Sequence, residues 1–126
     1  MTATRAVEVQ LTGTDPVALA PDLTVIPVPG HTRGSSCLLY SDRFLFTGDH
    51  VAWSIPLARV YAFRDACWYS WEEQQRSLAR FAAGGHRFDR LLCGHGWSHD
   101  SPADEMHEHL VALTERMVGP AEEAWR

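Results

Sequence analysis

Short apolar segments, separated by turn residues, recur along the chain and predict a set of β-strands. Some alternate apolar and polar residues, as expected for a half-buried strand, and others are continuously apolar, as expected for a buried one. Most of them end at glycine, proline or small polar residues, which favour turns. The candidate strands are Ala6–Leu11, Asp22–Val28, Ser36–Tyr40, Arg43–Thr47 and Arg90–Cys93.

Two local features refine these strands. Ser41 and Asp42 lie between two of the candidates and are typical of a tight polar turn, so we expect a hairpin there. Pro27 lies within the candidate strand Asp22–Val28 and has no backbone N–H to donate. This proline therefore predicts either an edge strand or a strand that ends at a site.

A first helix is predicted after Ser70. The segment from Ser70 to Glu73 matches a capping box, in which the serine side chain caps the helix and the glutamate reaches back. Gly84 and Gly85 are expected to end this helix. Its apolar residues Trp71, Leu78, Phe81 and Ala82 share one face.

A second helix is predicted from Ser101 and Pro102, since proline is favoured at the first helical position. Gly119 and Pro120 are expected to end it. We interpret its apolar stripe as a surface that faces the core. The stripe consists of Met106, Leu110, Leu113 and Met117.

These elements predict one α/β domain over residues 1–126, because the chain shows no repeat, linker or low-complexity segment. Strands are expected to form a mixed sheet with flanking helices, an α+β layered arrangement. The segment from His50 to Tyr69 is aromatic and irregular, and we expect a long loop that is functional or packed over the core.

Composition narrows the functional classes. Sixteen acidic residues exceed eleven basic ones, all of them arginine, and the net charge of -5 argues against nucleic acid as the substrate. No apolar segment approaches the roughly 20 residues of a membrane span, so no membrane association is expected. Three cysteines without CxxC spacing are typical of reduced thiols, which predicts a cytoplasmic protein. We expect Cys37 and Cys93 to be buried packing residues.

Three segments share one architecture, in which an apolar strand is followed by glycine and then by a side chain that can bind a metal. VIPVPGHTRGS places His31 after such a strand, FLFTGDH places Asp49, and RLLCGHG places His95. A strand delivers its last residue to the rim of a sheet, and glycine lets the backbone turn there. Imidazole and carboxylate groups suit Zn²⁺, and Fe or Mn are alternatives. Each segment alone is a common turn, but three of the same form predict a metal site.

The motifs GHTRGS, LFTGDH and CGHG resemble the later metal motifs of the metallo-β-lactamase fold hydrolases, which include glyoxalase II-like enzymes. The resemblance covers most of residues 22–97. It implies a four-layer αβ/βα sandwich, of which this chain resembles the C-terminal half. It also implies that His31 binds a first metal, that His95 binds a second, and that Asp49 bridges both as the central catalytic residue.

The chain departs from the family in one respect. Family members carry an HxHxDH segment that supplies most of the remaining ligands, and this sequence has none. We therefore expect the chain to be truncated, or to need a complementing N-terminal half or a second copy in a homodimer.

Counting ligands sharpens that expectation. Two protein ligands for each of one or two ions would bind weakly, because a catalytic zinc usually has three and a water. Alternatively, His31, Asp49 and His95 could all hold one ion, or His50 or His99 could be recruited. For His50 and His99 we favour a solvated histidine or one that supports a ligand.

Two functions follow from different classes. The first is a metal-dependent hydrolase, with zinc preferred, that acts on a small ester or thioester-type substrate through a metal-activated water. The alternative is a non-catalytic interaction module, or remnant of such a hydrolase, whose uncovered sheet face binds a partner. The aromatic residues Trp53, Tyr61, Phe63, Trp68 and Tyr69 could line a substrate cleft, and we favour instead that they cover the core.

Overall fold

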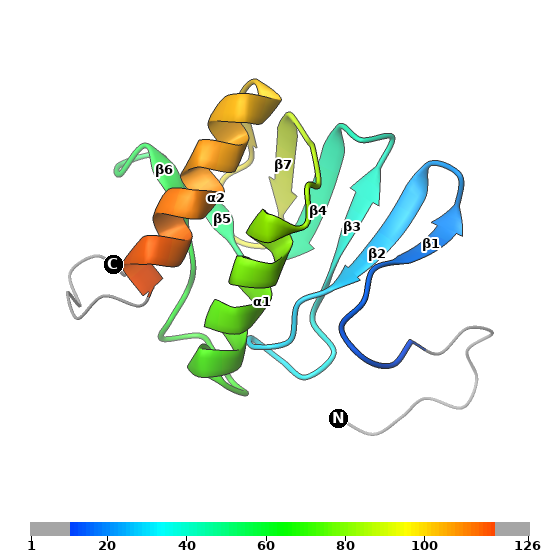
Figure 1. The fold of residues 1–126 in the computed structure, drawn as a ribbon. Helices are drawn as coiled ribbons and strands as arrows, with labels where there is room; N and C mark the ends of the chain where they lie inside the picture. Colours follow the sequence, from blue (N-terminus) through cyan, green and yellow to red (C-terminus); the bar gives the residue numbers. More distant parts are fainter. Residues whose placement is uncertain (1–10, 118–126) are drawn as a thin grey trace.

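The fold of the computed structural model, which describes residues 11–117, is a six-stranded mixed sheet with two helices packed on one face (Figure 1). The strands of this sheet are β1 (Val17–Ala20), β2 (Leu23–Pro27), β3 (Ser36–Tyr40), β4 (Phe44–Gly48), β7 (Arg90–Cys93) and β8 (His99–Asp100). A separate hairpin consists of β5 (Ala52–Ser54) and β6 (Arg59–Tyr61), and the helices are α1 (Trp71–Ala83) and α2 (Ala103–Met117).

The strand order in the sheet is β1-β2-β3-β4-β7-β8. Only β4 and β7 pair in parallel, and every other neighbouring pair is antiparallel. This arrangement confirms the predicted mixed sheet with flanking helices. Over residues 11–117, no helix is both long and apolar enough to cross a bilayer.

The predicted hairpin is formed by β3 and β4. Ser41 and Asp42 have φ angles of 54° and 50°, the left-handed values of a type I′ turn, and the Arg43 N–H closes this turn on the Tyr40 carbonyl oxygen at 3.1 Å. Strand pairing resumes with Phe44 opposite Tyr40, so Arg43 is an extra residue in the loop. The turn fixes the register in which Leu38 lies opposite Phe46. It thereby also decides which side chains of the two strands face the helices.

Helix α1 begins where the sequence predicts. The Ser70 hydroxyl accepts a hydrogen bond from the backbone N–H of Glu73 at 3.1 Å, as expected for an N-cap. The carboxylate of Glu73 instead pairs with Arg76 on the next turn, so only half of the capping box forms. At the other end, Gly85 has a φ of 74°, a conformation that favours glycine and ends the helix.

The core lies between the helices and the facing side of the sheet. The predicted stripe of α2 is fully buried, and so are Leu78 and Phe81 of α1. On the sheet, Cys37, Leu39 and Leu45 point into the same core. Both predicted helix faces are therefore confirmed.

Several expectations need correction or lie outside the described residues. Strand β2 has neighbours on both sides, so the expectation that Pro27 marks an edge strand is wrong. Pro27 is instead the last residue of its strand, in line with the alternative that the strand ends there. The segment from His50 to Tyr69, expected to be irregular, contains the β5–β6 hairpin. The candidate strand at residues 6–11 and the helix end at Gly119 and Pro120 fall on residues 1–10 and 118–126, outside the described part.

The face of the sheet opposite the helices carries apolar side chains that remain exposed. Along β3, Cys37 and Leu39 are buried, while Leu38 and Tyr40 point the other way and are exposed. On β4, Phe46 lies beside Leu38 and is 43% exposed. Apolar residues thus line both faces of the sheet, but the helices cover only one.

His50 is an unexpected member of the core. It is 2% exposed, lies beside Leu45 and Leu78, and neither ring nitrogen has a hydrogen-bond partner among the described residues. Burial, together with the nearby His31, lowers the pKa of His50 to about 3. The ring is therefore neutral at physiological pH. The expectation of a solvated His50 is therefore wrong, and the ring makes no hydrogen bond that would support a ligand within residues 11–117.

Replacing His50 with leucine, which has a similar volume, is expected to stabilise the fold by about 1–2 kcal/mol, because it removes two buried polar atoms that lack partners. Urea unfolding of the wild type and His50→Leu measures the change. His107→Leu, an exposed position on α2, is the matched control and should shift stability by no more than about 0.5 kcal/mol. A destabilised His50→Leu variant would contradict this account of the core.

Candidate metal centre

Three strands run in the same direction and end at one rim of the sheet. β4 and β7 are parallel, and β2 has the same direction because β3 lies antiparallel between β2 and β4. The arrowheads of β4 and β7 point to this common rim in Figure 1. The residues that follow these strands include His31, Asp49 and His95, so the topology places all three predicted residues at the same rim.

A backbone contact fastens two of these strand ends together. The N–H of Gly94 donates a hydrogen bond to the carbonyl oxygen of Gly48 at 2.7 Å. A Cβ on Gly94 would lie 2.9 Å from Oδ1 of Asp49 and 3.2 Å from the carbonyl oxygen of Gly48. Glycine is therefore needed at position 94 for the two loops to approach this closely.

The Asp49 carboxylate lies between two imidazoles. Its Oδ2 is 3.4 Å from Nε2 of His31, and its Oδ1 is 2.5 Å from Nδ1 of His95. The Asp49 side chain is partly exposed, His31 is mostly buried, and His95 is 78% exposed. The structure thus brings together the three side chains that the sequence singled out.

One of the two contacts has the spacing that two zinc ligands would have. Two ligand atoms that share a tetrahedral zinc at about 2.05 Å lie about 3.3 Å apart. The 3.4 Å between His31 and Asp49 matches this spacing, and Nδ1 of His31 is buried without a hydrogen-bond partner among the described residues. The 2.5 Å contact to His95 is a direct hydrogen bond, and an ion between the two groups would require His95 to swing outward. Its exposure leaves room for that movement.

The three side chains do not converge on one point. Asp49 uses a different oxygen toward each histidine, and within residues 11–117 no group of three His, Cys, Asp or Glu side chains could hold a metal ion. The alternative in which all three residues hold one ion is therefore not what this arrangement offers. The geometry corresponds to two half-sites that share a carboxylate.

The His31 loop is held from below by the start of α1. The His31 carbonyl oxygen accepts hydrogen bonds from the N–H groups of Trp68 and Tyr69, at 3.0 and 3.2 Å. Gly30 accepts one from Ser70 at 2.9 Å and packs so tightly on Gln74 that a Cβ at position 30 would collide with it. The helix N-cap and the candidate ligand thus belong to one rigid unit.

The remaining histidines lie elsewhere. His99 stacks on Trp53 with ring centroids 3.5 Å apart, and its Nε2 lies 2.6 Å from the Ser101 hydroxyl. Burial and the nearby His109 lower the pKa of His99. His107 is exposed, whereas His86, His99 and His109 are partly buried. His99 is therefore not the solvated histidine that was one of its two expected roles. His50 points into the core, away from the rim.

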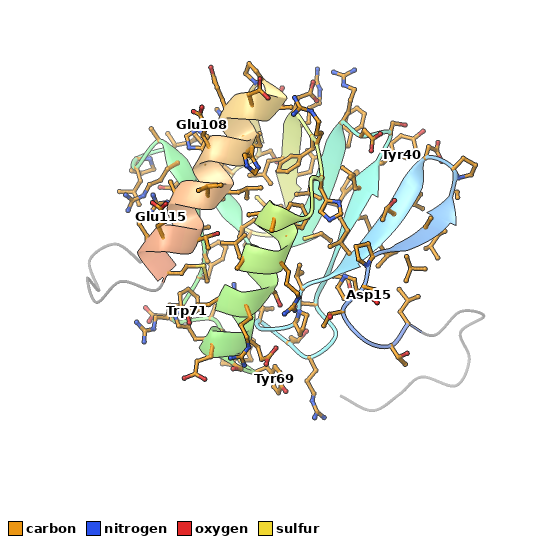
Figure 2. All side chains as sticks on the ribbon, in the orientation of Figure 1. Asp15, Tyr40, Tyr69, Trp71, Glu108 and Glu115 are labelled. Atoms are coloured by element: carbon orange, nitrogen blue, oxygen red, sulfur yellow. The ribbon has the colours of Figure 1, made fainter. Side chains whose placement is uncertain are left out.

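The aromatic residues divide into two groups. Trp53 is buried in β5 as part of the core, as we favoured. Tyr61 and Phe63 are half-buried and lie against Gly96, the residue after His95, so they border the rim. Trp68 is 77% exposed, and Tyr69 lies beneath the first turn of α1 (Figure 2) and is also exposed. The expectation that Trp68 and Tyr69 cover the core is therefore wrong, and both residues contact the His31 carbonyl oxygen through their backbone N–H groups.

Cys93 differs from the expectation of a buried packing residue. It is only partly buried, its thiol donates a hydrogen bond to the Trp97 carbonyl oxygen at 3.0 Å, and burial raises its pKa, with the neighbouring Asp49 adding to the rise. The exposed ring of Trp97 lies in the same loop. Cys93 and Trp97 are therefore residues of the rim that the apolar pattern of RLLC concealed.

No protein-family model matches this chain, and no curated protein matches it. Solved structures do. TMB-1 superposes with a TM-score of 0.61 at 17% identity, over 89% of this chain and 49% of its own. A metallo-β-lactamase from Pontibacter korlensis superposes with a TM-score of 0.54 at 16% identity, over 86% of this chain and 48% of its own. ETHE1 from Myxococcus xanthus superposes with a TM-score of 0.53 at 19% identity, over 95% of this chain and 57% of its own.

These similarities show the fold. The structure has the α/β architecture of metallo-β-lactamase fold proteins, and the chain spans about half the length of the solved structures that it matches. The fold class predicted from the sequence is thereby confirmed.

Gly94→Ala tests the close approach of the two loops. The added Cβ must displace Asp49 and the backbone at Gly48, so we expect a loss of about 1–3 kcal/mol in the free energy of unfolding, measured with urea. Ser98→Ala, at an exposed position of the same loop, is expected to change it by no more than about 0.5 kcal/mol. Equal stabilities of the two variants would show that the contact between the strand ends is loose.

Proposed function

We propose that the chain belongs to a metal-dependent hydrolase, with His31, Asp49 and His95 as its metal ligands. The observation that carries this proposal is the Asp49 carboxylate held between two imidazoles at the ends of three strands that run in the same direction. A carboxylate and two histidines form a donor set that suits zinc, and iron or manganese are the alternatives. The similarity to metallo-β-lactamase fold structures supports the same chemistry.

A metal ion bound there would supply a Lewis acid that activates water and polarises a substrate carbonyl. The chain's own residues would position it. Asp49 would offer one oxygen to each side, and the α1 N-terminal loop would keep His31 in place through its carbonyl oxygen. The Nδ1 of His95 and the Oδ1 of Asp49 are in hydrogen-bond contact at 2.5 Å, and this contact would have to open for both atoms to hold an ion.

The ligand count predicts weak binding by the chain alone. Each half-site has two protein ligands, Asp49 being common to both, whereas a catalytic zinc usually has three. The proposal therefore includes further ligands from a complementing half of the fold, as the glyoxalase II-like resemblance implies. One or two ions would then be held.

For the substrate we propose a small ester or thioester. The exposed ring of Trp68 belongs to a residue whose backbone N–H contacts the His31 carbonyl oxygen, and the exposed ring of Trp97 follows His95 by two residues. Both rings offer apolar contact to a small molecule. The net charge of -5 disfavours a nucleic acid.

For the cellular location we propose the cytoplasm. Within the described residues Cys37, Cys67 and Cys93 are free thiols, which agrees with this location.

Calorimetric titration of the chain with Zn²⁺ tests the ligand assignment. We expect weak binding by the wild type and at least about a tenfold loss of affinity in Asp49→Ala, because both half-sites depend on that carboxylate. His99→Ala, whose ring stacks on Trp53, is the control and should bind Zn²⁺ as the wild type does. Equal losses in the two variants, or none, would refute the assignment.

Hydrolysis is tested separately with chromogenic esters and thioesters in the presence of Zn²⁺, Mn²⁺ or Fe²⁺. Activity that Asp49→Ala abolishes would support a hydrolase. A chain that binds Zn²⁺ through these residues and yet hydrolyses none of the substrates with any of the metals would leave the site assignment intact and defeat catalysis by this chain alone.

A second candidate function is suggested by the uncovered face of the sheet. Leu38, Tyr40 and Phe46 are exposed there on adjacent strands, and a contiguous apolar surface of this kind is typical of an interface. The Arg90–Asp100 ion pair, with 3.2 Å between Nη1 and Oδ2, flanks the surface and leaves it without excess charge. A neutral apolar face can pack against a second copy of itself, so we propose that the chain associates through this face.

Light scattering after size exclusion tests the association. We expect the wild type to elute as a dimer of the 14.1 kDa chain and Phe46→Glu as a monomer, because a charge in the centre of the interface cannot be desolvated without a partner. Val111→Glu places the same charge at an exposed apolar position on α2 and should leave the dimer intact. A soluble wild-type monomer would contradict this candidate function.

A further inference from the structure

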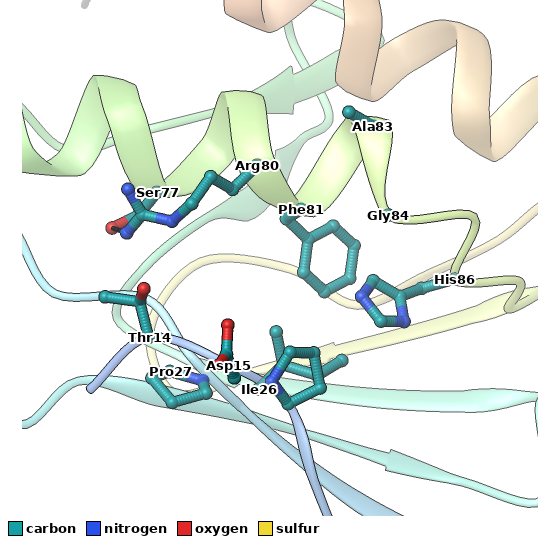
Figure 3. Close-up of a pocket in the computed structure, with 11 residues that line it drawn as sticks. Thr14, Asp15, Ile26, Pro27, Ser77, Arg80, Phe81, Ala83, Gly84 and His86 are labelled. Atoms are coloured by element: carbon teal, nitrogen blue, oxygen red, sulfur yellow. Dashed lines mark hydrogen bonds between the residues drawn. The ribbon is translucent and has the colours of Figure 1, made fainter. Parts of the chain in front are cut away.

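A cavity of about 440 Å³ opens between the strands at the β1 edge and the C-terminal half of α1 (Figure 3). Its lining comes from three segments: residues 14–16, the end of β2, and residues 77–86 of α1 and the following loop. His31, Asp49 and His95 are not among the lining residues, so the cavity is separate from the candidate metal centre. Its volume falls within the range of small-molecule sites.

The floor of the cavity is apolar. Ile26 of β2 and Phe81 of α1 are both almost fully buried in the core and present one side to the cavity. Figure 3 shows the ring of Phe81 directed from the helix toward Ile26. A ligand that occupies this space would lose contact with water over an aliphatic or aromatic part.

One cation stands over this floor. The Nη2 of Arg80 lies 3.2 Å from the Ser77 hydroxyl, which in turn donates to the carbonyl oxygen of Pro29 at 2.6 Å. None of the ion pairs within residues 11–117 involves Arg80. The serine thus directs the guanidinium while leaving its other N–H groups free for an anionic oxygen.

One anion lies on the opposite wall. Asp15 lines the cavity from the loop before β1, is exposed, and forms none of the ion pairs of the described residues. In Figure 3 its carboxylate faces the space beneath the helix. A ligand whose one charge is a carboxylate would be repelled by Asp15, and a ligand whose one charge is an ammonium group would be repelled by Arg80. Neither ligand therefore complements both walls of the cavity.

His86 closes the end of the cavity without adding charge. Its ring packs on Phe81 with 5.0 Å between centroids, and burial lowers its pKa, so the imidazole is neutral at physiological pH. A Cβ at position 84 would lie 2.7 Å from Nε2 of His86, so the glycine there leaves room for the ring. The cavity therefore offers one cation, one anion and an apolar floor.

We propose that this cavity is a binding site for a zwitterionic amino acid with an apolar side chain. Arg80 binds the carboxylate, Asp15 binds the ammonium group, and Ile26 and Phe81 contact the side chain. The site is independent of the proposed metal chemistry, since none of the candidate metal ligands contributes to it.

NMR titration of the full chain with L-phenylalanine tests the proposal. Two matched probes each lack one charge: 3-phenylpropionate has no ammonium group and phenethylamine has no carboxylate. We expect phenylalanine to bind at least about fivefold more tightly than either probe, a ratio that corresponds to one partly exposed ion pair. The largest backbone shifts are expected at residues 77–86 and 14–16.

Variants separate the cavity from the rest of the surface. Arg80→Gln and Asp15→Asn should each weaken phenylalanine binding at least about fivefold, because each removes one ion pair. Arg76→Gln on the same helix and Asp22→Asn in the next turn make the same charge changes away from the cavity and should leave binding unchanged. Equal binding of phenylalanine and 3-phenylpropionate, equal losses in the control variants, or no shifts at the lining residues would overturn the proposal.

Discussion

The parallel pairing of β4 with β7 is the constraint on which the candidate site depends. Parallel strands end at the same rim, so this one pair places the residues after Gly48 beside those after Cys93. A hydrogen bond of 2.7 Å from the Gly94 N–H to the Gly48 carbonyl oxygen then holds the two loops together. Asp49 and His95, separated by 46 residues in the chain, are neighbours for this reason.

The rest of the molecule supports that rim from one side. Helices α1 and α2 bury the inner face of the sheet, and the N-terminal loop of α1 also holds the carbonyl oxygen of His31. No helix covers the opposite face within residues 11–117, so Phe46 and Leu38 remain exposed to water there. Burying these side chains against another apolar surface would be favourable. This exposed apolar face is the observation behind the proposed association, whereas the proposed metal chemistry depends on the rim.

Local sequence signals predicted much of this architecture. The type I′ turn at Ser41 and Asp42, the cap at Ser70 and the stripe of α2 depend on neighbouring residues, and each is found where the pattern places it. The three glycine-flanked motifs also located the candidate ligands at one rim, because strand ends and glycine turns are visible in sequence.

Features set by tertiary packing were not predictable in this way. His50 occurs beside a candidate ligand, yet its side chain points into the core, since the chain turns between Gly48 and Val51. Gln74 and Ser77 are buried polar residues whose partners, the carbonyl oxygens of His50 and Pro29, are remote in sequence. Short strands such as β5 pair only through long-range contacts and carry too few residues for a periodic signal.

The central claim is that His31 and His95, of the seven histidines, are the two imidazole ligands. Imidazole ¹⁵N NMR of the chain, recorded with and without Zn²⁺, tests it most directly, because binding shifts the ring nitrogen that contacts the metal. The account predicts metal-dependent shifts at His31 and His95 and unchanged resonances at His50 and His99. Shifts confined to other histidines, or none at saturating Zn²⁺, would contradict it.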